Sequence, residues 1–210
     1  AKWLRTMVAE LQRIASHLIG IGFFLQDLGT LGTPLMYGFR IREKILDLFE
    51  MLCGARITLA YMRPGGVFSD TPPDFWPALS QFMDELPSEI GEIEQLVLEN
   101  EIVLVRTKGV SPLPLDMAIN WSVSGPVLRA SGLPWDWRKE EPYDAYEWVD
   151  FDVPVGANGD NYDRFWVRMQ EIRQSERIIR QCMEHIESGP VRLDLPLVVR
   201  PESGAEAYGR

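Results

Sequence analysis

Apolar residues recur at intervals of three and four along several stretches of the chain, which is the spacing of an amphipathic helix. The predicted helices cover residues 3–26, 40–53, 73–99, 114–121 and 160–186. A short strand is predicted over 102–105. The second half of the first helix is apolar on all sides, so it must be buried against another element. The pattern therefore predicts a mainly α protein, a helical bundle with a few short strands.

Residues 121–154 have neither helical spacing nor sustained alternation, and they are interrupted by Gly and Pro. They nevertheless carry Trp121, Trp135, Trp137, Tyr143, Tyr146, Trp148 and Phe151. Disordered linkers are poor in aromatic residues, so we predict a long ordered loop with packed aromatics. Its charged residues, which we expect to pair among themselves, are Arg129, Asp136, Arg138, Lys139 and Asp152. A functional loop and a packed surface loop with a structural ion-pair network are both open readings.

Composition excludes several classes of protein. The 210 residues carry a net charge of −10 without a dominant basic patch, which argues against a nucleic-acid partner. Two cysteines and two histidines lie far apart, so the sequence predicts neither a disulfide framework nor a metal site. The longest uncharged apolar run, Leu18–Leu25, is too short to cross a bilayer, and we expect no transmembrane span.

Asp27 stands at the end of the apolar half of the first helix. Burial and a helix C-terminus both disfavour a charged carboxylate, which makes Asp27 a candidate proton-handling group. A solvated aspartate at the helix end is the alternative. A loop rich in Gly and Pro is predicted over residues 30–38, and Pro87 is expected to kink or divide the helix over 73–99.

The last predicted helix has a basic side, formed by Arg164, Arg168, Arg173, Arg177 and Arg180. This side either meets a partner or is a solvated face with ion pairs to Glu171, Glu176 and Glu184.

Residues 124–175 resemble the D-type subunit, also called the 49 kDa-type subunit, of respiratory NADH-quinone oxidoreductase (complex I). The family pattern is SG-x2-LR-x-SG-x3-D-x-RK-x2-PY-x2-Y, followed by FDVP-x-G-x2-GD-x2-DR and then by the E-x-RQS of a helix. The matching positions are Gly125, Leu128, Arg129, Ser131, Gly132, Asp136, Arg138, Lys139, Pro142, Tyr143, Tyr146, 151–154, Gly156, Gly159, Asp160, Asp163 and Arg164. A second match, GAR followed by RPGGV, begins at Gly54. The resemblance runs over about residues 1–192 and leaves 193–210 as a Pro-rich and polar tail.

The resemblance implies the large-subunit fold of nickel–iron hydrogenases and a role in a proton-pumping NADH:quinone oxidoreductase. Such a subunit binds no cofactor itself. It forms part of the quinone chamber and docks the small B-type subunit, which carries the terminal 4Fe-4S cluster. The C-type subunit and the H-type membrane subunit are further implied partners, at the cytoplasmic side of the cell membrane. Family members are longer than this chain, so we expect a partial or shortened subunit that is inactive in isolation.

The resemblance also implies roles for individual residues. Asp27 matches the Asp of the family's LDLG pattern, which partners a histidine at the quinone headgroup, and that histidine lies upstream of this stretch. Chamber lining is implied for Ile19, Phe23, Thr33 and Met36, and proximity to the partner's cluster for Arg56 and Thr58. Thr58 stands where the family has a histidine. A threonine cannot take up a proton, so the cluster potential is expected to vary little with pH.

Two other functions remain open from the sequence. One is the large subunit of a membrane-bound nickel–iron hydrogenase, which shares ancestry and fold with this complex I family. The other is a non-catalytic helical assembly module.

Overall fold

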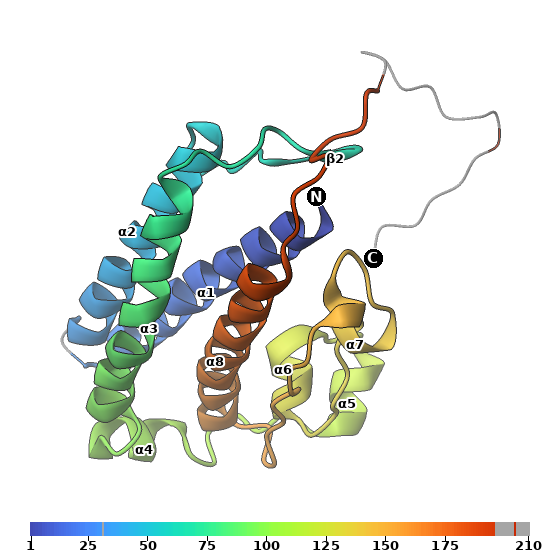
Figure 1. Ribbon diagram of the computed structural model, residues 1–210. Coiled ribbons are helices and arrows are strands. Elements are labelled where there is room, and N and C mark those ends of the chain that lie inside the picture. The colour runs from blue at the N-terminus through green and yellow to red at the C-terminus, as the bar shows by residue number, and fades with distance from the viewer. Residues whose placement is uncertain (31, 196–203, 205–210) are drawn as a thin grey trace.

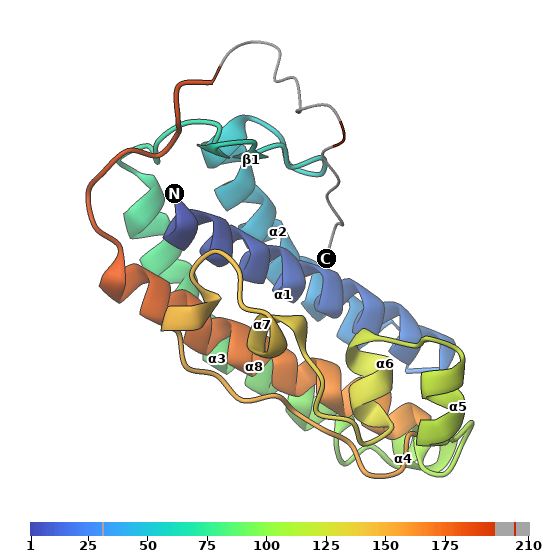
Figure 2. The ribbon, with the colours of Figure 1, turned by 90° about the vertical axis from the view of Figure 1, so that its right-hand side faces the viewer.

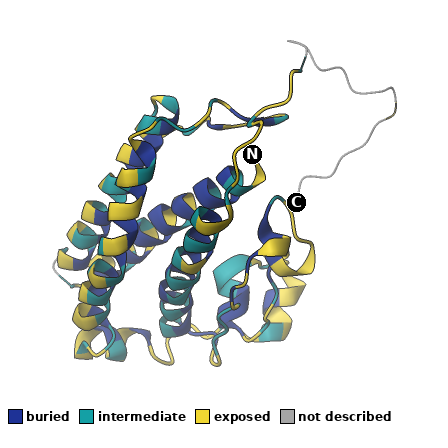
Figure 3. Ribbon diagram, viewed as in Figure 1, coloured by how far each residue is buried: buried dark blue, intermediate teal, exposed yellow. Residues whose placement is uncertain are grey.

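The computed structural model describes residues 1–30, 32–195 and 204, and it is mainly helical, as predicted. Its long helices are α1 (Lys2–Asp27), α2 (Thr33–Cys53), α3 (Phe75–Val97) and α8 (Asn161–His185). α1 packs against both α2 and α8, and α2 also packs against α3 (Figure 1). The buried faces of these helices point toward one another and form the core (Figure 3).

The shorter elements are α4 (Glu101–Thr107), α5 (Leu115–Asn120), α6 (Gly125–Ala130), α7 (Trp137–Glu140), the 3-10 helix η1 (Tyr146–Trp148), β1 (Met62–Arg63) and β2 (Gly66–Val67). α6 and α7 lie along the side of the bundle formed by α1 and α8 (Figure 2). The segment after α8 returns to the far end of the bundle, where Leu193 N–H donates to Gly65 O at 3.0 Å. Of the predicted tail, residues 196–203 and 205–210 lie outside the described residues.

β1 and β2 form an antiparallel hairpin in which Met62 pairs with Val67 and Arg63 with Gly66. Gly66 also bridges to Arg192, at a φ of +149°. A Cβ atom at this position would lie 2.2 Å from the carbonyl oxygen of Val191. Only glycine fits both this backbone conformation and this close approach.

α1 is the helix of the described residues that is long and apolar enough to cross a membrane by length and composition alone. Its apolar stripe is Leu4, Met7, Leu11, Ile14, Leu18, Ile21 and Leu25, all of it buried. The core helix of a bundle passes the same test, and α1 has α2 and α8 packed against it. Burial inside this chain therefore accounts for the apolar stripe.

α2 begins earlier than the sequence pattern indicated. Residues 33–38 are helical, so the predicted loop over 30–38 was wrong for most of its length. Proline is compatible with the first turn of a helix, and Pro34 occupies it, after Gly32 in the left-handed conformation at φ +76°. Pro34, Gly38 and Ile41 are buried, which extends the stripe of α2 back to its first turn.

α3 is not divided at Pro87, contrary to one of the two outcomes expected. Proline has no N–H to donate to the carbonyl four residues earlier, which is that of Met83. The guanidinium of Arg180 on α8 donates to this carbonyl instead, at 2.5 Å. Arg173 donates to the carbonyl of Pro87 at 3.2 Å. Arg180 thus replaces the hydrogen bond that proline cannot make.

α4 occupies the stretch predicted as a strand, and that prediction was wrong. The side-chain oxygen of Asn100 accepts hydrogen bonds from the N–H groups of Ile102 and Val103, at 3.0 and 3.4 Å. This is the geometry of a helix N-cap, which favours a helix over the extended conformation. Val103 and Thr107, four residues apart, are its buried positions.

Residues 121–154 are ordered, but they contain α6, α7 and η1 rather than loop alone. Tyr146 and Phe151 are buried as expected. Other aromatics of this segment are not: 75% of Trp121 and 51% of Trp148 are exposed. The expectation of a fully packed aromatic loop was therefore right only for the side that faces α1 and α8.

Candidate functional site

The end of α1 and the start of α2 bring together most of the residues expected to line a chamber. Phe23 and Met36 are 49% and 68% exposed, Thr33 is exposed, and Ile19 is partly buried. The ring of Phe23 meets that of Phe39 edge-on, with centroids 6.2 Å apart. The junction thus presents apolar side chains that the rest of the described chain does not cover.

Two glycines set how closely α1 and α2 approach here. A Cβ atom on Gly22 would lie 2.7 Å from a side-chain carbon of Leu35. A Cβ atom on Gly38 would lie 3.0 Å from the carbonyl oxygen of Leu18. The absence of side chains at both positions lets the two backbones pack closely, which fixes where Phe23 and Met36 stand.

Asp27 is the last residue of α1, and it is exposed. Among the described residues, no hydrogen bond or ion pair reaches its carboxylate. The surrounding backbone is tied down instead: Thr30 Oγ1 donates to Leu25 O at 2.7 Å, and Arg106 donates to Leu28 O at 2.5 Å. Within the part of the chain that the structure describes, Asp27 is therefore exposed rather than buried, and it lies on a fixed turn.

Arg56 and Thr58 lie at the other end of α2, so the structure does not bring them to Asp27. The 21 residues of α2 separate the two groups by roughly 30 Å. The guanidinium of Arg56 turns back onto α2, where it pairs with Glu43 at 2.5 Å, with Glu50 at 3.2 Å and with Asp47. Thr58 is exposed. Their placement near a partner's cluster stays a prediction.

A network of buried charges joins α1, α8 and the segment 121–154. The sequence predicted pairing within this segment, but it did not predict the partners on α1 and α8. The centre of the network is Glu10, which is fully buried. Glu10 accepts hydrogen bonds from Arg138 at 3.1 Å, from Tyr146 at 2.5 Å and from Ser175 at 2.6 Å, and it pairs with Arg13 at 3.2 Å. Burial acts to raise the pKa of Glu10, but Arg13 and Arg138 hold that pKa below its usual value.

The second half of the network is centred on Glu171, also fully buried. One oxygen of its carboxylate pairs with Arg129 at 2.6 Å, and the other lies 2.6 Å from His17 Nε2. Burial lowers the pKa of His17, although the hydrogen bond to Glu171 opposes the effect. His17 is thus held neutral and donates to the carboxylate. Asp136 links the two halves, 3.4 Å from Arg129 and 2.7 Å from Arg138.

The network is electrically balanced with His17 neutral. Three carboxylates, Glu10, Asp136 and Glu171, face three guanidinium groups, Arg13, Arg129 and Arg138. Buried charges persist only where they are paired and hydrogen-bonded, and each of these is. The segment 121–154 is therefore anchored to both long helices by charge as well as by apolar packing.

The expected pairing within residues 121–154 is confirmed for Arg129, Asp136 and Arg138. Asp152 pairs instead with Arg177 on α8, at 3.1 Å. The ammonium of Lys139 lies 4.4 Å from the centre of the Phe151 ring.

The sequence spacing could have indicated that Glu10 is buried. Glu10 follows Met7 by three residues and precedes Ile14 by four, so it lies on the buried stripe of α1. Glu171, expected to be solvated, has buried neighbours four residues away on each side, at Val167 and Ser175.

Most of the basic side of α8 is paired within the chain. Arg173 pairs with Glu94 at 2.7 Å, and Arg180 with Glu176 at 3.1 Å. Arg177 pairs with Asp150 and Asp152. The two arginines nearest the start of α8, Arg164 and Arg168, have no carboxylate partner among the described residues.

Among the described residues, no group of three or more His, Cys, Asp or Glu side chains is placed to hold a metal ion. Cys182 is buried, and burial raises the pKa of its thiol to about 12, which makes it unreactive near neutral pH.

Comparison with known proteins gives a consistent result. Residues 27–208 match the profile of a family described as respiratory-chain NADH dehydrogenase, 49 Kd subunit. The D-type NADH-quinone oxidoreductase subunit of Dehalococcoides mccartyi (strain ATCC BAA-2266 / KCTC 15142 / 195) is 51% identical over 210 residues, all of this chain and 57% of the relative. The D 1 NADH-quinone oxidoreductase subunit of Roseiflexus sp. (strain RS-1) is 48% identical over 218 residues, all of this chain and 58% of the relative. The chain thus spans a little over half the length of these relatives.

Proposed function

Since the chain belongs to the family of the 49 Kd subunit of respiratory-chain NADH dehydrogenase, we propose that it works as part of the D-type subunit of an NADH:quinone oxidoreductase. In this role it forms one wall of the quinone chamber and docks the subunit that carries the terminal 4Fe-4S cluster. The B-type, C-type and H-type subunits of the complex are the proposed partners, at the cytoplasmic side of the membrane.

The proposal rests on the α1–α2 junction, where exposed apolar side chains lie beside an exposed carboxylate. Phe23 and Asp27 stand one turn apart on α1, and Met36 follows in the first turns of α2. Exposed apolar side chains suit a long apolar quinone tail, and ligand sites combine such walls with a few polar groups. Asp27 supplies the polar group, and its carboxylate has no partner among the described residues to compete for a proton.

In the proposed reaction, the partner subunit and this chain have different tasks. Reduction of a quinone to a quinol takes two electrons and two protons, and the partner's cluster supplies the electrons. This chain's residues place the quinone and deliver protons. The Asp27 carboxyl, exposed on a fixed turn, takes up a proton from water and passes it toward a quinone oxygen. Phe23, Met36 and Ile19 hold the apolar part of the quinone and limit the access of water.

The test is Asp27→Asn in the assembled complex, measured in membranes. Asparagine keeps the size of the side chain but cannot carry the proton. Loss of a general acid–base group costs about 10²–10⁴-fold in rate, so we expect NADH–quinone activity to fall by a factor in that range. NADH should still reduce an artificial electron acceptor, and the complex should assemble normally.

A matched control is Asp116→Asn, which changes an exposed aspartate on α5, away from the junction. It should leave both activities unchanged. Quinone activity that survives Asp27→Asn intact would show that Asp27 is structural, and the chain would be better described as a scaffold. The fold resemblance to the nickel–iron hydrogenase large subunit stays a prediction. Iron and nickel analysis of the assembled complex separates the proposed function from that of a membrane-bound nickel–iron hydrogenase.

A further inference from the structure

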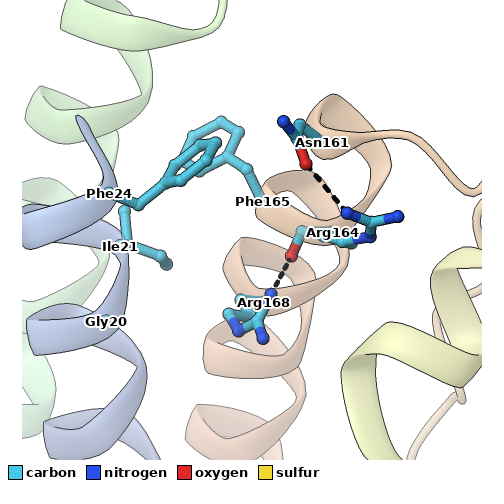
Figure 4. A pocket seen from close by; sticks show the side chains of 7 residues that line it. All are labelled: Gly20, Ile21, Phe24, Asn161, Arg164, Phe165 and Arg168. Carbon is cyan, nitrogen blue, oxygen red and sulfur yellow. Dashed lines mark hydrogen bonds between the residues drawn. The ribbon is translucent and has the colours of Figure 1, made fainter. Parts of the chain in front are cut away.

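A cavity of about 260 Å³ opens between α1 and the start of α8 (Figure 4). Ile21 and Phe24 of α1 and Phe165 of α8 form its apolar walls, and Arg164 and Arg168 line its α8 side. It is distinct from the α1–α2 junction, because Phe23 of the junction contacts Phe39 of α2 rather than α8.

Arg164 is held at the cavity entirely by neutral acceptors. Its Nη1 donates to Asn161 Oδ1 at 2.8 Å, and its Nη2 donates to the carbonyls of Ser111 and Gly159 at 2.6 and 2.8 Å. Its Nε is buried and has no hydrogen-bond partner among the described residues. A buried N–H left unpaired is costly, so this atom indicates a missing acceptor.

Arg168 also lacks a counter-charge. Its Nη1 donates to the carbonyl of Arg164 at 2.7 Å, and no carboxylate of the described residues lies within ion-pair distance. Burial lowers the pKa of Arg168, with Arg164 and Arg129 adding to the effect and Glu171 opposing it. Glu171 already pairs with Arg129 and His17, so it cannot serve Arg168 as a dedicated partner.

Among the arginines of α8 that the structure describes, only those at the cavity lack a carboxylate partner. Further along α8, each of Arg173, Arg177 and Arg180 pairs with a carboxylate. Within the described residues, the two unpaired arginines of this helix are therefore the two that face an open space. Charge complementarity calls for an anion there.

We propose that this cavity receives the carboxylate of an acidic side chain from a neighbouring polypeptide of the complex, which pairs with Arg164 and Arg168. A carboxylate suits the site because it is a planar monoanion on an apolar stem. The stem would contact Phe24 and Phe165, and the oxygens would accept from the guanidinium groups. Phosphate carries more charge and more oxygens than the buried Nε of Arg164 and the remaining donors of Arg168 can satisfy beside aromatic walls.

The isolated chain allows a test that needs neither NADH nor quinone. Gly20 lines the cavity, and a Cβ atom added there meets nothing within 4 Å. Gly20→Glu supplies a carboxylate from within the chain, and Gly20→Gln is its neutral match. We expect Gly20→Glu to melt about 2–4 °C above Gly20→Gln, and we expect that difference to vanish when Arg168→Gln is added to both.

Arg168→Gln alone should melt at or slightly above the parent, because it removes an uncompensated charge from the isolated chain. If Gly20→Glu and Gly20→Gln melt alike in the parent, or differ equally with and without Arg168, the cavity is not an anion site. A marked loss of stability from Arg168→Gln alone would show that the arginine is structural, and it would also overturn the proposal.

The source of the carboxylate is tested in the assembled complex. Truncating one member of a buried charge pair mainly speeds dissociation, so the complex with Arg168→Gln should lose this chain at least roughly tenfold faster on dilution. Arg177→Gln, which changes an arginine paired within the chain, is the control and should dissociate like the parent. Dissociation of the Arg168→Gln complex at the parental rate would rule out an acidic side chain of a partner polypeptide.

Discussion

The buried charge network and the α1–α2 junction are opposite kinds of polar site. In the network, Glu10 has four partners within the chain, and every other charge is likewise paired. At the junction, Asp27 has no partner among the described residues, and Met36 is 68% exposed. The network is complete in this chain, whereas the junction offers groups for something else to contact.

This difference fits a structural role for the network and the functional role that we propose for the junction. A buried carboxylate with satisfied hydrogen bonds fixes the position of the elements that carry its partners. An exposed carboxylate beside exposed apolar side chains adds little to the stability of the chain, and it is free to handle protons or ligands. Changes in the network should therefore alter stability, and changes at the junction should alter activity only.

The largest effect is expected for Glu10→Gln. The substitution leaves the buried Arg138 and the partly buried Arg13 beside a neutral amide, and breaking a buried ion pair from one side costs about 3–5 kcal/mol. Urea unfolding monitored by circular dichroism measures this loss. The control is Glu99→Gln, at an exposed position of the α3–α4 connection, which should change stability by less than about 0.5 kcal/mol. Equal effects of the two variants would show that the network is not what holds residues 121–154.

A smaller effect is expected from pH through His17. Its pKa in the folded chain lies below the unfolded value of 6.5, chiefly because of burial. Below pH 6.5 the unfolded chain therefore binds a proton that the folded chain does not, and the free energy of unfolding falls as the pH falls. Glu10 and Glu171 have lowered pKa values in the fold, so their contribution is lost only as the pH falls below 4.5.

His17→Gln should flatten the first of these two losses, because glutamine still donates to Glu171 but does not titrate. Melting temperatures between about pH 8 and pH 5 measure the slope. His185→Gln, at an exposed position on the last turn of α8, should keep the parental slope. A parental slope in His17→Gln as well would assign the pH dependence to other groups.

The smallest effect on stability is expected for Met36→Gln at the junction. Substitutions of exposed residues change stability by less than about 0.5 kcal/mol. In the assembled complex, the same variant should raise the KM for quinone several-fold with little change in assembly, because it removes apolar contact with the quinone. Val105→Gln, at a 72% exposed position of α4, should leave the KM unchanged. A parental KM in Met36→Gln would remove this residue from the proposed chamber.

Local pattern was enough to find the long helices. The stripe from Leu4 to Leu25 predicted α1, and the stripe from Phe165 to Ile179 predicted α8, because apolar spacing in the sequence records which face is buried. Apolar spacing predicted the wrong structure where local capping and backbone preferences determined the conformation. The cap of Asn100 made α4 a helix, and Pro34 lies in the first turn of α2, ahead of the start predicted at residue 40.

For the candidate site as well, part could be predicted from the sequence and part only from the tertiary structure. The sequence by itself identified the family resemblance, the stretch that contains Asp27 and the apolar residues around it. The tertiary structure alone decided which charges are buried together, since Glu10, Arg138 and Glu171 lie far apart in the sequence and meet only when α1, α7 and α8 pack. Periodicity records the preference of each position for water or core. A buried charge violates that preference, and only the position of its partner in space explains why it is tolerated.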